Sequence, residues 1–411
     1  MVPPRRPVSQ IWLGSMALAQ LSLWLGLYAP LKTLVPLLAA QIAQDSLSSG
    51  ASKEAVLAAV TLAGSLVAVV ATPLAGSLSD RSRSPWGRRS PWIAGGSLVA
   101  ALGIGLLPQA HSELGMVLLW SLASLGLSCC LAALHGSTAD RVPSDQQGSL
   151  WGWVGLAQPL GLVFGVGLCS LLLPNVLLAA LVLAGLVVVA NGPLLALERR
   201  QPASPSPAGP MASANDRHRS LAAFRHRPFM RLWISRFLLF LGWSISTVYL
   251  LYFLEDRLGL PQGQALQALT LLLALYASGT ALASALAGPL ANRLEQRLLL
   301  VLVGTGGMAL ACALMLLSQS LPLALIGASV LGLSYGTYAA SHQALVVQHL
   351  PSDQHHGRDL GLFNGANSSA MVISPVLAWC LVSQLGGYGS LFLAASILIL
   401  ISALPLLRLT D

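Results

Sequence analysis

Four ionisable side chains lie inside long apolar stretches of the sequence, where a charge is costly. They are Lys32, Arg236, His135 and His342. Lysine and arginine can bind an anionic or hydroxyl-bearing solute, and histidine can take up and release a proton near neutral pH. A charge in apolar surroundings costs on the order of 2.5–3.5 kcal/mol on insertion scales, so such residues usually serve a function.

Lys32 lies between Pro30 and Pro36, which predicts a broken or kinked helix at this point. Three roles are open to it. It binds the substrate, it pairs with Glu255 or Asp256 to close an outer gate, or it extends along the helix to the outer headgroups.

Arg236 either extends to the inner membrane surface or faces a cavity as a counter-charge. His342 is the first candidate to carry a coupling proton and His135 the second, because no Asp or Glu lies deep in any apolar run. The alternative for His342 is a neutral imidazole that binds substrate or helps to close an inner gate.

Several uncharged polar residues in the apolar runs are candidates to line a cavity. Tyrosines and amides suit sugars, which offer hydroxyl groups and apolar faces. Each of these residues could instead form hydrogen bonds between helices. The candidates retained are Tyr28, Gln158, Tyr249 and Asn364.

No motif for catalysis or for a cofactor is found in the sequence. There is no P-loop, no zinc or haem spacing, and the five cysteines all lie in apolar runs. We therefore expect no enzyme, catalytic residue, metal or cofactor, and the placement of the net charge of +8 does not suggest nucleic-acid binding.

The elements that position these residues are predicted to be membrane-spanning helices. Charged residues make up 9% of the 411 residues, against about 25% in soluble proteins, and hydrophobic residues make up 55%. Mean hydropathy is +0.73. Charge-free runs long enough to cross a bilayer predict an all-α membrane protein with twelve transmembrane helices.

The spans form two six-helix halves, residues 1–197 and 230–411, joined by a charged and proline-rich linker at 198–229. With both termini in the cytoplasm, all but four of the 22 Lys and Arg residues fall on the inner side or in the linker. We expect a multi-pass protein of the bacterial inner membrane, surrounded by lipid and monomeric.

The two halves also repeat. Gly76 to Arg81 follows the second span, and Gly288 to Arg293 follows the equivalent span of the second half. Val-Pro-Ser-Asp-Gln at 142–146 and Leu-Pro-Ser-Asp-Gln at 350–354 form a second matched pair. Parallel halves of this kind are an architecture of transporters.

With these motifs the whole chain resembles the major facilitator superfamily, and residues 79–92 resemble its sucrose and glycoside symporter branch. The resemblance implies the major facilitator fold and a gate formed by the charged motif after the second span. The glycines would permit close helix approach, and the charges would pair across the moving halves. The gating residues are Gly76, Asp80, Arg81, Arg88, Arg89, Gly288 and Arg293.

The sequence thus predicts a secondary active transporter of a small organic solute that works by alternating access, with a sugar or glycoside slightly preferred and a proton or cation as a possible coupling ion. The alternatives are efflux of an amphipathic or anionic compound, and a non-transporting assembly factor or sensor.

Overall fold

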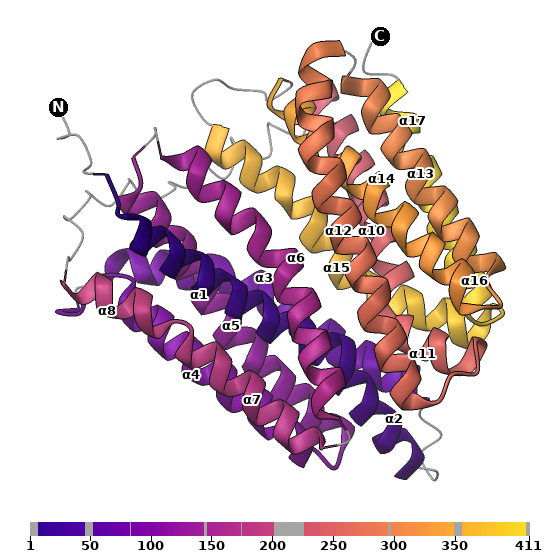
Figure 1. The fold of residues 1–411 in the computed structure, drawn as a ribbon, viewed down its shortest axis with the longest axis horizontal. Coiled ribbons are helices and arrows are strands. Elements are labelled where there is room, and N and C mark those ends of the chain that lie inside the picture. The colour runs from indigo at the N-terminus through magenta and orange to yellow at the C-terminus, as the bar shows by residue number, and fades with distance from the viewer. Residues whose placement is uncertain are drawn as a thin grey trace. The chain divides into compact units, whose positions relative to one another are not determined.

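The regular elements of the chain are all helical within the described residues (Figure 1). The structure is a computed structural model, and it describes residues 7–45, 52–82, 84–143, 146–173, 175–200, 226–294, 297–348 and 356–407. The all-α prediction is confirmed.

The helices of the N-terminal half begin and end close to the charged residues and turn signals of the sequence. They are α1 (Gln10–Ala29), a π-helical turn (Pro30–Leu34), α2 (Val35–Asp45), α3 (Lys53–Arg81), α4 (Ser90–Leu106), a short 3₁₀ turn (Leu107–Gln109), α5 (Glu113–Arg141), α6 (Gln147–Leu172), α7 (Val176–Val189) and α8 (Gly192–Arg200).

The helices of the C-terminal half follow the same order. They are α10 (Arg227–Val248), α11 (Leu250–Tyr252), a π-helical turn (Phe253–Arg257), α12 (Gln262–Leu294), α13 (Arg297–Leu317), α14 (Leu321–Gln348), α15 (His356–Gln384), α16 (Tyr388–Ile401) and α17 (Leu404–Leu407).

Eleven helical segments of the described residues are long and apolar enough to span a membrane. A further pair, Arg227–Val248 and Leu250–Arg257, is bent by 47° and makes a twelfth span when counted as one. The first span runs unbroken from Gln10 to Asp45 and passes through Lys32. The predicted twelve spans are therefore confirmed.

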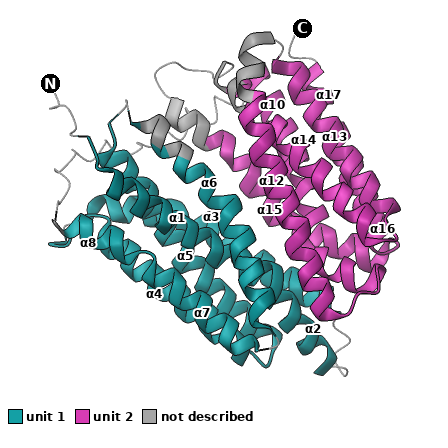
Figure 2. Ribbon diagram, viewed as in Figure 1, with its two compact units in different colours: residues 1–209 teal, residues 210–411 magenta. Residues whose placement is uncertain are grey.

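Each half is a compact unit, residues 1–209 and 210–411 (Figure 2). The division falls inside the predicted linker, of which residues 201–225 lie outside the described residues. Helix α8 includes the first residues of the predicted linker, and α10 includes its last residues.

The two units repeat the same helix pairings. In the first unit α1 packs on α6, α3 packs on α5, and α4 packs on α5 and α7. In the second unit α10 packs on α15, α12 packs on α14, and α13 packs on α14 and α16. The short sequence repeats thus mark the same positions of a repeated architecture.

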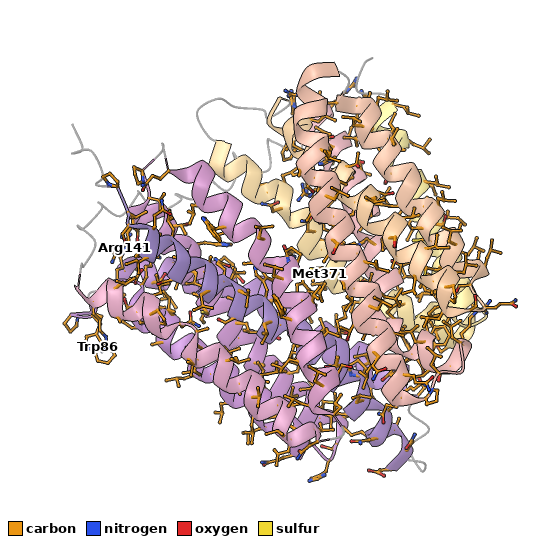
Figure 3. The ribbon with its side chains drawn as sticks, in the orientation of Figure 1. Trp86, Arg141 and Met371 are labelled. Atoms are coloured by element: carbon orange, nitrogen blue, oxygen red, sulfur yellow. The ribbon has the colours of Figure 1, made fainter. Side chains whose placement is uncertain are left out.

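The outer helix faces carry large apolar side chains. Leu171 is 84% exposed, Ile11 72% and Val189 71%. Figure 3 shows carbon-rich side chains along the helices of both units, with Trp86 and Arg141 at one end of the first unit. A soluble protein rarely exposes such continuous apolar area, and these faces suit lipid.

The first span of each unit contains a π-helical turn. In the first unit it begins at Pro30, where the sequence predicts a break, and it includes Lys32. In the second unit it covers Phe253–Arg257, just after the bend at Tyr249. Such turns interrupt the regular hydrogen-bond ladder and are frequent at functional sites.

Close helix contacts in the first unit depend on glycine. A Cβ at Gly161 of α6 would lie 2.8 Å from the carbonyl oxygen of Leu21 and 2.9 Å from the backbone nitrogen of Leu25, both on α1. A methyl group does not fit at these distances. The sequence Gly161-x-x-x-Gly165 therefore marks a packing contact.

We expect Gly161→Ala to lower the unfolding free energy by about 1–3 kcal/mol, because the added methyl group overpacks the contact between α1 and α6. Gly155→Ala, on the same helix, is the matched control, since a Cβ there meets nothing within 4 Å. The thermal unfolding midpoints of the two variants in detergent measure the difference. Equal midpoints would contradict the packing role.

Candidate functional site

The C-terminal unit contains a cavity of about 200 Å³ between its own helices. A charged side chain, aromatic rings and a histidine line it together. The lining residues are Arg236 and Phe240 of α10, and Tyr335, Tyr338, Ala339 and His342 of α14. Polar groups converging on an apolar cavity are typical of a binding site for a small molecule.

Arg236 is held in place by two amides and two rings. Its Nε donates to Oδ1 of Asn367 at 2.8 Å, and its Nη2 donates to Oδ1 of Asn364 at 3.5 Å. The guanidinium carbon lies 5.3 Å from the ring centroid of Phe240 and 5.0 Å from that of Phe363. These contacts fix the direction of the guanidinium and hold it within the helix bundle.

None of the described residues gives Arg236 a carboxylate partner. Amide oxygens and ring faces stabilise a guanidinium but leave its charge in place. Arginine always carries this charge in proteins, because its guanidinium does not deprotonate. The cavity therefore has a net positive wall.

His342 lies deeper in the same cavity and is 1% exposed. Its ring stacks on Tyr338 at 4.6 Å and on Phe363 at 5.8 Å between centroids. Neither imidazole nitrogen has a hydrogen-bond partner within the described part of the chain, and the same holds for the hydroxyl of Tyr338. Buried polar groups are nearly always hydrogen-bonded, so these three atoms are available to a ligand or to water.

Tyr335 is the centre of an aromatic cluster beside the cavity. Its ring centroid lies 5.9 Å from Trp243 in a stacked arrangement, 6.3 Å from Phe240 edge-on and 6.0 Å from Tyr276. The cluster joins α10, α12 and α14. It makes one side of the cavity flat and apolar.

The structure brings Arg236, His342 and Asn364 together, although the sequence places them in three separate helices. Sequence reasoning missed the roles of Phe240 and Phe363. Tyr335, Tyr338 and His342 follow a spacing of three and four residues, which places them on one face of a helix, and Phe240 follows Arg236 by four. This spacing was the available signal.

Tyr249 is placed elsewhere. It is 1% exposed at the bend between α10 and α11, and its ring stacks on Tyr252 at 6.0 Å. It does not line the cavity in the C-terminal unit. Its position at the bend makes it a packing residue there.

Three predicted site residues lie in the N-terminal unit. Gln158 Nε2 of α6 donates to the hydroxyl of Tyr28 of α1 at 2.8 Å, and Trp24 stacks on Tyr28 at 5.7 Å. Lys32 is half-buried in the π-helical turn that follows α1. Gln158 and Tyr28 thus join α6 to α1 through a side-chain hydrogen bond.

The predicted pairing of Lys32 with Glu255 or Asp256 joins residues of different units and stays a prediction. Within its own unit, Asp256 Oδ2 accepts a hydrogen bond of 2.5 Å from the hydroxyl of Tyr388.

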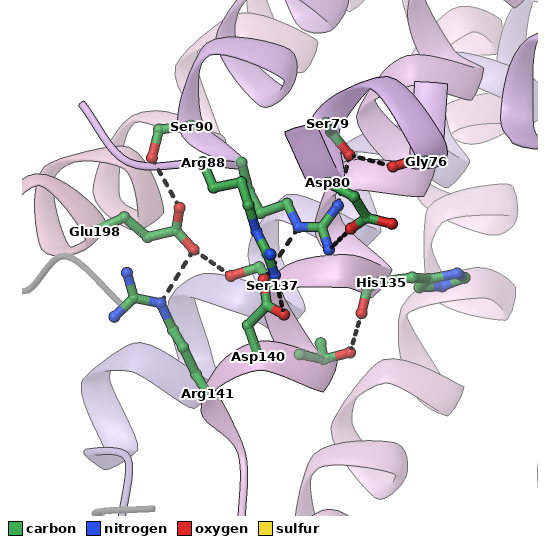
Figure 4. Close-up of polar contacts among 12 residues, drawn as sticks. Gly76, Ser79, Asp80, Arg88, Ser90, His135, Ser137, Asp140, Arg141 and Glu198 are labelled. Carbon is green, nitrogen blue, oxygen red and sulfur yellow. Dashed lines mark hydrogen bonds and ion pairs between the residues drawn. The ribbon is translucent and has the colours of Figure 1, made fainter. Parts of the chain in front are cut away.

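The charged motif after α3 belongs to a network at one end of the N-terminal unit (Figure 4). Arg89 is 8% exposed and contacts both Asp80 and Asp140, with a distance of 3.1 Å to Asp140. Arg88 binds Asp140 at 2.5 Å, and Arg89 donates to the hydroxyl of Ser79 at 2.5 Å. Two arginines and two aspartates thus join α3, α5 and the loop before α4.

Glu198 of α8 forms the adjoining part of this network. It is 2% exposed and accepts hydrogen bonds from Ser90 at 2.9 Å and from Ser137, and Arg141 lies 3.6 Å away (Figure 4). The predicted linker begins at residue 198, whereas α8 continues to Arg200 and carries Glu198. Sequence reasoning also missed Asp140, whose signal was its place beside Arg141 at the end of an apolar run.

The other residues predicted to form the gate differ in their surroundings. A Cβ at Gly76 would meet nothing within 4 Å, so the expected close helix approach is not found within its described surroundings. Arg81 is exposed, and Figure 4 shows the His135 side chain pointing away from the charged network. Gly288 and Arg293 belong to α12, and their side chains lie outside the described part of the structure.

The sequence of the chain matches a known protein family. Two overlapping stretches, residues 15–274 and 232–411, match the Major Facilitator Superfamily. A segment of 167 residues is 30% identical to "Uncharacterized MFS-type transporter C18.02" of Schizosaccharomyces pombe, covering 41% of this chain and 37% of that protein. The chain thus matches little more than a third of the length of this relative.

Solved structures share the fold across the chain. The nucleoside transporter NupG has a TM-score of 0.74 at 15% identity, over 98% of this chain and 100% of the other. The human organic anion transporter MFSD10 (TETRAN) has a TM-score of 0.67 at 18% identity, over 98% and 100% of the two chains. With six-span repeats in both units and family matches that extend over nearly the whole sequence, the chain belongs to the Major Facilitator Superfamily.

Proposed function

We propose that this transporter carries small organic anions by alternating access. The observation that supports this is the guanidinium of Arg236, which lines a cavity and has no carboxylate partner among the described residues. An anionic solute would supply the missing charge. Arginine is well suited to this task, because its planar fork binds a carboxylate through two hydrogen bonds.

The hydrogen-bond chemistry of the surrounding amides points the same way. The side-chain oxygens of Asn364 and Asn367 accept from Arg236, which leaves their NH₂ groups as donors. With the guanidinium itself and the tyrosine hydroxyls, the site is rich in donors. A carboxylate offers only acceptors and fits such a site.

A sugar or glycoside is the second candidate, and the rings of Phe240 and Tyr335 favour it, since sugars present apolar faces that pack on aromatic rings. A sugar hydroxyl also needs acceptors, however, and the described lining of the cavity contains no carboxylate. The named substrates of the structural neighbours, a nucleoside and an organic anion, differ from one another, so the shared fold does not choose between solutes.

We further propose that the protein is a monomer in a bacterial inner membrane. Both termini lie in the cytoplasm in this proposal, because the positive-inside rule then places most of the basic residues on the inner side. Lys32 stays a candidate for substrate binding or for the outer gate. If it only reaches towards the headgroups, Lys32→Gln leaves substrate affinity unchanged.

We expect Arg236→Gln to abolish uptake of organic anions into proteoliposomes, and Arg236→Lys to retain a small fraction, because lysine keeps the charge without the planar fork. Arg257→Gln is the control, since Arg257 is exposed and binds the carbonyl of Leu316 at 3.3 Å, outside the cavity. The measurement is the initial uptake of a panel of labelled anions and sugars.

Undiminished anion uptake by Arg236→Gln would overturn the proposal. Uptake of neutral sugars alone by the native protein would replace it with the second candidate. Ligand binding without flux in the native protein would indicate a sensor.

His342 is the proposed carrier of a coupling proton. It shares the cavity with Arg236, so a protonated imidazole would add a second positive charge to one wall, and a bound anion would offset both charges. The proton and the anion would then favour each other's binding, as coupled transport requires.

We expect His342→Gln to prevent accumulation of solute against its gradient while exchange of labelled for unlabelled solute continues. His135→Gln is the comparison, because His135 is exposed on α5 and points away from the charged network. Full accumulation in His342→Gln would exclude this role, and loss of accumulation only in His135→Gln would transfer it to His135.

The charged network of the N-terminal unit is the proposed inner gate. Asp80 has a side chain that is 49% exposed, whereas that of Asp140 is 13% exposed and binds both Arg88 and Arg89. The two aspartates therefore differ in their exposure and in the number of arginines that they contact. Asp80 is free to change partners during the transport cycle, and Asp140 is part of the packed end of the unit.

We expect Asp80→Ala to reduce the transport rate with little change in thermal stability, because half-exposed ion pairs contribute little to it. Asp140→Asn should lower stability by a few kcal/mol, since it leaves two largely buried arginines without their shared carboxylate. Transport rates and unfolding midpoints, measured for both variants, test the distinction. A normal rate in Asp80→Ala would remove it from the gate.

A further inference from the structure

The cavity in the C-terminal unit is lined by chemically different groups. Arg236 with its amide partners supplies a charge. Tyr338 supplies an unpartnered hydroxyl group and His342 two unpartnered ring nitrogens. The rings of Phe240 and Tyr335 line the cavity between helices α10 and α14. A ligand that satisfies all three parts must carry a different group for each.

The side walls favour a flat ring over an aliphatic chain. Tyr335 is braced by Trp243 and Tyr276, so its ring is held in one orientation by neighbours on α10 and α12. Phe240 meets it edge-on. Aromatic rings prefer such offset and edge-on neighbours, which stabilise a bound ring beyond the effect of buried area alone.

The volume sets the size of the group that the cavity itself can hold. The cavity of about 200 Å³ is below the range of roughly 300–1,000 Å³ found for drug-sized ligands. It accommodates a single ring with small substituents.

The unpartnered polar atoms indicate which further group the ligand carries. Tyr338 is 2% exposed and His342 is 1% exposed, so neither side chain reaches bulk solvent. A buried polar group without a partner is costly, so a ligand that supplies one binds more tightly. A hydroxyl group on the ligand can accept from the tyrosine hydroxyl, and it can donate to a neutral imidazole or accept from a protonated one.

We infer that the cavity between α10 and α14 binds a single-ring aromatic carboxylate that carries a polar substituent such as a hydroxyl group. The carboxylate pairs with Arg236, the ring packs on Phe240 and Tyr335, and the substituent meets Tyr338 and His342. This inference rests on the proposed function and narrows its substrate class.

Four ligands separate the parts of the site: 4-hydroxybenzoate, benzoate, cyclohexanecarboxylate and the uncharged benzyl alcohol. We expect calorimetry on the full-length protein in detergent to rank them in this order, with no measurable binding of the alcohol. Equal affinities for cyclohexanecarboxylate and benzoate would overturn the aromatic part. Stronger binding of benzoate than of 4-hydroxybenzoate would overturn the polar part.

Two variants test whether the ligand binds in this cavity. Tyr338→Phe should weaken binding of 4-hydroxybenzoate about three- to tenfold and leave benzoate unchanged, because it removes a single hydroxyl group. Phe240→Leu should weaken benzoate more than cyclohexanecarboxylate. The comparison between ligands is an internal control, because misfolding would weaken all of them equally. Unchanged affinities for all four ligands in both variants would overturn the inference.

Flux measurements separate this inference from the function on which it rests. Uptake of aliphatic and aromatic anions at equal rates would retain the proposed function and overturn the aromatic specificity. Absence of uptake for every anion, with sugars still transported, would overturn both.

Discussion

The function proposed for the C-terminal unit depends on the positive charge of Arg236, which has no carboxylate partner among the described residues. Arg236 lies within a helix that is otherwise apolar at this depth, and its stabilisation comes from amide oxygens and ring faces. A protein carboxylate beside Arg236 would neutralise the guanidinium charge and weaken the binding of an anion that we propose. The arrangement keeps the guanidinium fixed while its charge stays open to a ligand, which is the preorganisation that lowers the cost of binding. The aromatic residues serve the same end, since they exclude water and strengthen the field at the cavity.

In the N-terminal unit, by contrast, the arginines of the charged network are paired with carboxylates. Arg88, Arg89 and Arg141 all have carboxylate partners, which come from α3, α5 and α8. This network closes one end of the unit and satisfies its own members, so it is suited to a structural and gating role more than to binding solute. The repeated architecture therefore carries different chemistry in its two copies. The C-terminal copy of the motif has Asn292 at the position of Asp80, which agrees with this division of work.

The sequence was sufficient to predict the helical spans, because crossing a bilayer imposes length and hydrophobicity on every span. It also marked Arg236 and His342, since a polar group inside an apolar run is visible without any coordinates. It could not show that Asn364, Asn367 and Phe363 of α15 meet Arg236 of α10, because more than a hundred residues separate them and apolar patterning does not specify which helices pack together. It placed Glu198 in the linker because charge was taken as the end of a span, whereas a buried carboxylate with two serine donors and an arginine can extend one. For Tyr249 the sequence pattern leaves two roles open, because a polar aromatic residue in a span suits packing at a bend as well as the lining of a cavity.

Each of the two units has a π-helical turn in its first span. The turns lie at Pro30–Leu34 and at Phe253–Arg257, and each leaves the ladder of backbone hydrogen bonds irregular at one level of the helix. An irregular level bends more easily than a continuous α-helix, because fewer bonds must be broken to change its direction. Arg236 lies on the regular part of its span, α10, well before the bend at Tyr249. A change of direction at the bend can therefore move the far end of the span while the guanidinium keeps its contacts with α15. The residue proposed to bind the ligand is thus separate from the bend, which suits a site that holds its ligand while the surrounding protein changes shape.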